Sequence, residues 1–204
     1  MALPRPFEAV VFDMDGLLVD TEVVVFRAMQ RAADGIGGEM PMPTFQRMVT
    51  LHALYDIALG FEHSPLLACT AFGVPPSQTA DGHALFARAF DFEAAEVFDK
   101  DKAVFIVREK DKIPFASVAW PGFVGVVTGM NAEGVAIAVH GGRAKDISTK
   151  GIPIAFSMRD TLASTRTTEE AVARLSKEDV MVSHIVFVGD AKGDFAVVER
   201  APGT

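Results

Sequence analysis

The residue best suited to covalent chemistry is Cys69, the only cysteine among the 204 residues of the chain. A thiol is a weak nucleophile unless a base or a neighbouring positive charge helps to remove its proton. Two charged residues, Arg88 and Asp91, follow on the next apolar segment. A free cysteine is more often a small buried hydrophobe, and an Arg/Asp pair can be an exposed ion pair, so both interpretations must be weighed.

The segment that begins at Ala68 reads ACTAFGVPPSQTADGHALFARAFDFE, and WPGFVGVVTGMNAEGVAIAV, MRDTLASTRTTEEAVARL and VGDAKGDFAVVE follow it. In this order, and over residues 50–204, these motifs resemble the penicillin acyltransferase-like N-terminal-nucleophile amidohydrolases. The resemblance implies that the chain cuts itself before Cys69, and that Arg88 and Asp91 are the pair that serves the new terminus. It also implies an α+β fold: a partial αββα sandwich, preceded here by a short βα leader.

A cysteine at a chain terminus carries its own base. The α-amino group titrates near 7.7–8.0, so it can take the thiol proton and later return it to a leaving amine. The predicted reaction is amide hydrolysis or acyl transfer through a thioester. By resemblance, Asp91 would hold the α-ammonium group and Arg88 would position the thiol or the scissile carbonyl.

Strand geometry opposes a joint role for this pair. Residues three apart on a regular strand point to opposite faces, so Arg88 and Asp91 can both reach one thiol only where the strand is irregular. We therefore expect the chain to bend or to leave regular pairing between Ala87 and Phe92. The junction residue before the cysteine is Ala68 where the family usually has glycine, which would slow self-cleavage.

The position of the oxyanion hole also departs from the family. The resemblance places an asparagine near the end of the strand after the Gly-Met-Asn-Ala-Glu-Gly turn, and this chain has His140, Gly141 and Gly142 there. An imidazole N–H or a glycine backbone N–H could take its place. Asn131, within the turn itself, is interpreted as a turn residue because asparagine tolerates left-handed backbone.

A second resemblance competes for the N-terminal region. EAVVFDMDGLLVDTEVVVFRAMQRAA, within residues 1–49, resembles the start of the haloacid dehalogenase-like hydrolases. It implies an alternative function, a Mg²⁺-dependent phosphatase or phosphomutase whose residues would be Asp13 (nucleophile), Asp15 (acid), Thr128 (phosphate) and Asp190 with Asp194 (metal). The segments after Thr128 and Asp194 alternate like strands, however, where that fold requires helices. A third hypothesis is an inactive fusion or fragment.

Three segments are therefore expected: a leader at 1–49, a possible pro-segment at 50–68, and an amidohydrolase-like domain at 69–204 that is truncated at its C-terminal end. Periodicity predicts helices at Thr21–Ala33 and Leu51–Leu59, and Thr167-x-x-Glu170 is a capping box that begins a further helix. The predicted strands are Cys69–Val74, Ala84–Phe92, Val104–Val107, Phe123–Thr128, Gly134–His140, His184–Gly189 and Asp194–Arg200.

Composition narrows the class of partner. The net charge is −8 and there is no block of Lys or Arg, which argues against nucleic acid and anionic membranes. No apolar run is long enough to span a bilayer, and the five histidines lack metal-site spacing. We expect a cytoplasmic enzyme without a cofactor, acting on a small acyl or amide substrate.

Overall fold

The computed structural model describes residues 41, 43, 67–92, 102–120, 123–142, 148 and 151–203. Nearly all of the predicted leader and pro-segment lies outside these ranges. The helices expected at Thr21–Ala33 and Leu51–Leu59, and the acidic residues Asp13 and Asp15, therefore remain predictions.

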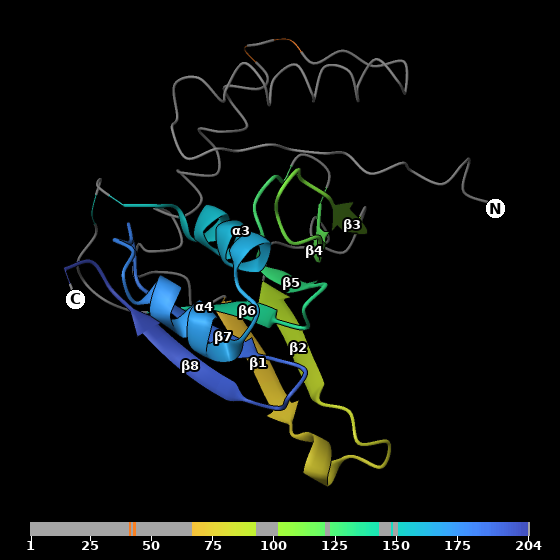
Figure 1. The fold of residues 1–204 in the computed structure, drawn as a ribbon. Coiled ribbons are helices and arrows are strands. Elements are labelled where there is room, and N and C mark those ends of the chain that lie inside the picture. Colours follow the sequence, from red (N-terminus) through yellow and green to blue (C-terminus); the bar gives the residue numbers. More distant parts are fainter. Residues whose placement is uncertain are drawn as a thin grey trace.

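The centre of the molecule is an antiparallel sheet of six strands that follow one another in chain order. Two helices pack on one face of this sheet (Figure 1). The strands are β3 (Ala103–Val107), β4 (Phe115–Ala119), β5 (Thr128–Asn131), β6 (Ala136–Gly141), β7 (His184–Gly189) and β8 (Phe195–Arg200), and the helices are α3 (Ile154–Ser164) and α4 (Thr168–Leu175).

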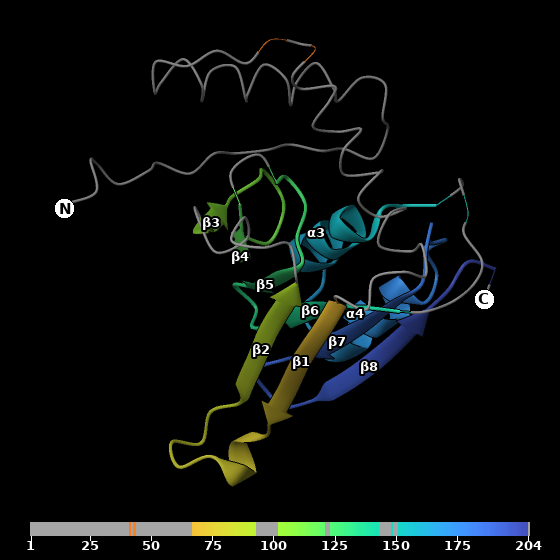
Figure 2. The same cartoon turned by 180° about the vertical axis from the view of Figure 1, so that it is seen from behind.

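A hairpin of two further strands, β1 (Leu67–Val74) and β2 (Leu85–Phe92), lies on the opposite face of the sheet, with β1 against β6 (Figures 1 and 2). The short 3₁₀ helix η1 (Pro76–Gln78) lies in the connection between them. The described chain is thus an α+β sandwich of helices, a large sheet and a small sheet, as the sequence predicted.

The side chains of β6 explain how this sheet can be covered on both faces. Ile137 and Val139 point to the helices and join the buried core around Met158 of α3. Ala136 and Ala138 alternate with them and face the hairpin. Because alanine is short, the hairpin backbone can lie close to the sheet here.

The β7–β8 turn provides a support for the tip of the hairpin. Gly193 adopts a φ of +87°, a left-handed conformation that glycine reaches without strain. A Cβ atom at Gly193 would collide with the ring of Pro76 in η1. The glycine therefore serves both the turn and the close contact between the two sheets.

The strand predicted at Phe123–Thr128 is wrong. The chain is not a strand from Phe123 to Val127; it enters β5 only at Thr128 and remains extended to Asn131. The valines of this stretch are buried because it packs beside α3, where the Val126 N–H donates to the Ala155 carbonyl at 2.9 Å. The apolar sequence of this stretch therefore indicates that it is buried, and not that it is a strand. Strand β4 was not predicted.

The helical motif from Met158 to Leu175 forms the second part of α3 and all of α4. Thr167 is the N-cap of α4, and its hydroxyl accepts from the Glu170 N–H at 3.2 Å, which confirms the predicted cap. The Glu170 carboxylate accepts from Arg166 N–H at 2.7 Å, one residue earlier than in the usual capping box. Within the described ranges, no helix is long and apolar enough to cross a membrane.

Candidate active site

Cys69 lies on the face of the hairpin that looks toward the large sheet. The register pairs Cys69 with Phe90, Ala71 with Arg88 and Gly73 with Phe86, so these six residues share one face. Phe86 stacks on Phe187 of the large sheet, with ring centroids 4.9 Å apart. The thiol is therefore placed between the two sheets and not on the outer surface of the hairpin.

The expected break in β2 is absent. Pairing with β1 is regular from Leu85 through Phe92, so the prediction of an irregularity between Ala87 and Phe92 was wrong. Arg88 needs no bulge to reach the thiol, since its position is the diagonal neighbour of Cys69 on the same face. Asp91 pairs with Ala68 in this register. The side chain of Asp91 is outside the described structure, so its role remains a prediction.

Arg88 makes two hydrogen bonds to the large sheet and one to the thiol within the hairpin. Its Nη1 donates to Thr128 Oγ1 at 2.8 Å. Its Nη2 donates to the Val139 carbonyl at 2.8 Å and lies 3.4 Å from Cys69 Sγ. The planar fork of a guanidinium suits such a divided arrangement, which an ammonium group cannot reproduce.

An aromatic ring also packs against the guanidinium group of Arg88. The Arg88 guanidinium carbon lies 4.2 Å from the centroid of the Phe90 ring, and Phe90 in turn contacts Trp120 at a centroid distance of 5.5 Å. A permanently charged group is thereby held against the sulfur in a partly buried space. Such a group can stabilise a developing oxyanion.

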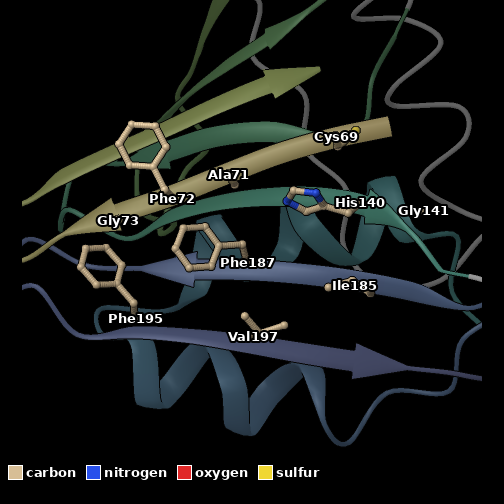
Figure 3. Close-up of a pocket in the computed structure, with 10 residues that line it drawn as sticks. All are labelled: Cys69, Ala71, Phe72, Gly73, His140, Gly141, Ile185, Phe187, Phe195 and Val197. Atoms are coloured by element: carbon tan, nitrogen blue, oxygen red, sulfur yellow. The ribbon is translucent and has the colours of Figure 1, made fainter. Parts of the chain in front are cut away.

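His140, at the end of β6, lies beside Cys69 on the same side of the large sheet (Figure 3). Burial lowers the pKa of its imidazole below the ordinary 6.5, and the charge of Arg88 lowers it further, whereas a hydrogen bond with the Cys69 backbone raises it. The net shift is downward, so the ring is neutral at pH 7.

A cavity of about 550 Å³ opens between β1 and the strands β6 to β8. Cys69 and His140 lie at one end, and aromatic and aliphatic side chains line the remainder (Figure 3). The principal apolar members are Phe72, Ile185, Phe187, Phe195 and Val197. This arrangement can hold an apolar group with its reactive end at the sulfur.

Asn131 has a structural role through its side chain and not through the left-handed backbone considered for it, because it ends strand β5 and its φ is not positive. Its side-chain amide donates to the carbonyls of Leu162 and Thr165, at 2.8 and 2.7 Å. Its side-chain oxygen accepts from the backbone N–H groups of Glu133 and Val135. The buried side chain therefore ties the β5–β6 turn to the C-terminal end of α3.

The described residues of the phosphatase alternative, Thr128, Asp190 and Asp194, form hydrogen bonds with other groups of the protein. Thr128 accepts from Arg88, and strands follow both Thr128 and Asp194. The Asp190 carboxylate accepts backbone hydrogen bonds from Thr168, Lys192 and Asp194; burial raises its pKa, but these donors lower it more. Within the described part of the chain, no three His, Cys, Asp or Glu residues are grouped to hold a metal ion.

Two contributors to the site escaped the sequence interpretation. Thr128 is the hydrogen-bond partner of Arg88, although the sequence offered only a phosphate-binding role for it. The Val139 carbonyl is a backbone group and leaves no signal in the residue type. Phe187 and Phe195 line the cavity from strands that are distant in sequence from the hairpin.

Comparison of the sequence with known families identifies the family of this chain. Residues 78–204 match the family described as acyl-coenzyme A:6-aminopenicillanic acid acyl-transferase. The chain belongs to this family. The match includes Arg88, Asp91 and His140 and begins after Cys69. The resemblance to haloacid dehalogenase-like hydrolases finds no support among the relatives.

Relatives of known structure share the fold. The N-acylethanolamine-hydrolyzing acid amidase ortholog of Caenorhabditis elegans aligns with a TM-score of 0.50 at 17% identity, over 65% of this chain and 59% of that one. The R18L variant of conjugated bile acid hydrolase from Clostridium perfringens aligns with a TM-score of 0.51 at 17% identity, over 66% of this chain and 48% of that one.

Another relative is a much longer protein than this chain. An uncharacterized protein of Archaeoglobus fulgidus is 30% identical over 151 residues, which are 71% of this chain and 25% of that protein. The chain thus spans a quarter of this relative and about half of the two solved structures.

Proposed function

We propose that this protein is an amide hydrolase or acyltransferase whose nucleophile is Cys69, exposed as a chain terminus by self-cleavage after Ala68. The observation that carries the proposal is the contact between Arg88 Nη2 and Cys69 Sγ, 3.4 Å long, at the end of an apolar cavity. Membership of the acyl-transferase family and the amidase names of its structural relatives support the same reaction class.

In the proposed reaction the thiolate attacks the acyl carbon of an amide. The α-amino group of Cys69 takes the thiol proton and passes it to the leaving amine, and water or another amine then resolves the thioester. Donors at the end of β6, the His140 ring N–H or the Gly141 backbone N–H, would stabilise the oxyanion. Arg88 would hold the sulfur, and Asp91 would hold the α-ammonium group.

The cavity indicates the kind of acyl group. Its aromatic walls and its volume of about 550 Å³ suit an apolar chain or ring. No metal or organic cofactor takes part in this mechanism.

The decisive experiment combines the intact mass of the purified protein with hydrolysis of a series of N-acyl p-nitroanilides. Wild-type protein should begin at Cys69, and Cys69→Ala should remain uncleaved and inactive. Thr70→Ala is the matched control, because Thr70 is exposed and points to the other face of β1. Normal processing of Cys69→Ala would overturn the mechanism.

The phosphatase alternative has its own test. Asp13→Asn should leave amidase activity within a few-fold of wild type. A Mg²⁺-dependent phosphatase activity that disappeared in Asp13→Asn would establish the alternative instead. Absence of both activities from a correctly folded chain would indicate the inactive fusion or fragment.

A further inference from the structure

Self-cleavage poses a problem that later turnover does not. Before the bond after Ala68 is broken, the nitrogen of Cys69 is an amide and cannot act as a base. Another group must take the thiol proton and then protonate the departing nitrogen. Apart from the Cys69 thiol itself, His140 is the only described residue lining the cavity whose side chain can accept and release a proton.

Arg88 ties the backbone next to His140 to the sulfur of Cys69. One nitrogen of that side chain, Nη2, contacts both Cys69 Sγ at 3.4 Å and the Val139 carbonyl at 2.8 Å. That carbonyl belongs to the peptide bond between Val139 and His140. The thiol and the backbone that carries the imidazole are therefore bridged by a single atom.

The imidazole is also in a suitable protonation state. Its hydrogen bond with the Cys69 backbone raises its pKa, so the ring is the donor and the acceptor is a carbonyl oxygen. A neutral imidazole that donates through one nitrogen has a lone pair on the other. Burial and the charge of Arg88 keep the ring neutral at pH 7.

We propose that His140 is the proton-transfer group of self-cleavage, whereas the α-amino group of Cys69 serves the later turnover. This inference rests on the proposed function. His140 would first transfer the proton in self-cleavage. The same ring would later serve as an oxyanion donor in substrate turnover.

The cleavage step can be written in full. His140 takes the thiol proton as Cys69 Sγ bonds to the carbonyl carbon of Ala68. The bond from this carbon to the Cys69 nitrogen then breaks, and the imidazolium gives its proton to that nitrogen. Water hydrolyses the thioester between Ala68 and the sulfur, which releases the preceding segment as a carboxylic acid and leaves a free thiol and a free amine.

The test follows processing of the full chain by intact mass, in a time course from pH 5 to 9. His140→Gln should slow processing by about 10²-fold or more, the usual contribution of a general acid–base group. Added imidazole should restore cleavage in His140→Gly. The control is His83→Gln, which changes an exposed histidine on the β1–β2 connection and should process at the wild-type rate. Circular dichroism and thermal melting verify that each variant folds.

The outcomes separate this inference from the proposed function. If wild type never cleaves before Cys69, the proposed function fails and this inference fails with it. If wild type cleaves and folded His140→Gln cleaves equally fast, only the role of His140 is overturned. Slow cleavage of His140→Gln together with rescue of His140→Gly by imidazole would support proton transfer, since a purely structural role gives no such rescue.

Discussion

Arg88 shows how one side chain can join two sheets and contact the thiol that we propose as the nucleophile. Its two terminal nitrogens reach a hydroxyl, a backbone carbonyl and the thiol, and the ring of Phe90 lies against its flat face. These contacts fix the direction of the fork. The hydroxyl of Thr128 is the one side-chain oxygen among these partners, so it can be changed without moving the backbone.

Replacing Thr128 by valine should weaken the site while the fold persists. Valine keeps the shape of threonine but cannot accept from Arg88 Nη1. A hydrogen bond to a charged group contributes about 1.5–3 kcal/mol, which corresponds to roughly 10- to 100-fold in rate. We expect kcat/KM for amide hydrolysis to fall about 10-fold, since the other contacts of Arg88 remain. Thr128→Ser keeps the oxygen and should stay within about threefold of wild type. Equal loss in both variants would mean that packing, and not the hydrogen bond, matters at this position.

Asn131 offers a second prediction at the scale of one residue. It makes four hydrogen bonds in a buried position, and Asn131→Ala would leave two carbonyls and two N–H groups without these partners. The free energy of unfolding should fall by about 3 kcal/mol, measured by urea denaturation. Gln78→Ala, at an exposed position in η1, should change it by less than about 0.5 kcal/mol. A similar loss in both would show that the buried network contributes little.

The elements illustrate what sequence can and cannot predict here. Elements with regular alternation or a capping signal, such as strands β1 and β7 and helix α4, were located within a few residues. The chain before β5 was misassigned because burial against α3 and strand pairing produce the same run of valines. The contact of Arg88 with Thr128 joins residues 40 positions apart. No local pattern encodes it, because it depends on how the two sheets stack.

Strand β8 supplies a test of the acyl pocket at the scale of an element. Val197 lines the cavity and is 62% exposed, so a larger side chain fits there without disturbing the core. Val197→Phe should narrow the cavity and shift preference toward shorter acyl chains, lowering kcat/KM for the longest p-nitroanilides by about 10-fold. Val104→Phe is the matched control, because Val104 is 65% exposed on β3 and does not line the cavity. An unchanged chain-length profile in Val197→Phe would place the acyl group elsewhere.

At the scale of the whole molecule, the large sheet separates two histidines that lie in different surroundings. His140 faces the hairpin and the cavity, whereas His184, near the start of the same sheet ladder, is buried. Burial lowers the pKa of His184 from 6.5 to about 3, and the nearby charge of Arg200 lowers it further. His184 is thus a neutral part of the fold at pH values well above 3.

This buried histidine should make stability depend on pH. Between about pH 3 and 6.5 the unfolded chain binds a proton at His184 and the folded chain does not. The contribution to stability is therefore complete above pH 6.5 and is lost as pH falls, at up to about 1.4 kcal/mol per pH unit. The lowered pKa of His140 acts in the same direction, so a variant of His184 should flatten the dependence without abolishing it.

The measurement is urea unfolding of wild type and His184→Gln from pH 4.5 to 7.5. Glutamine does not titrate, so the variant should lose less stability on acidification, and the gap between the two proteins should close by about 2–3 kcal/mol across this range. His83→Gln, which changes an exposed histidine, should follow the wild-type curve. Parallel curves for wild type and His184→Gln would mean that water reaches the imidazole in the folded protein. The large sheet would then not isolate the helix-side core from the open cavity on its other face.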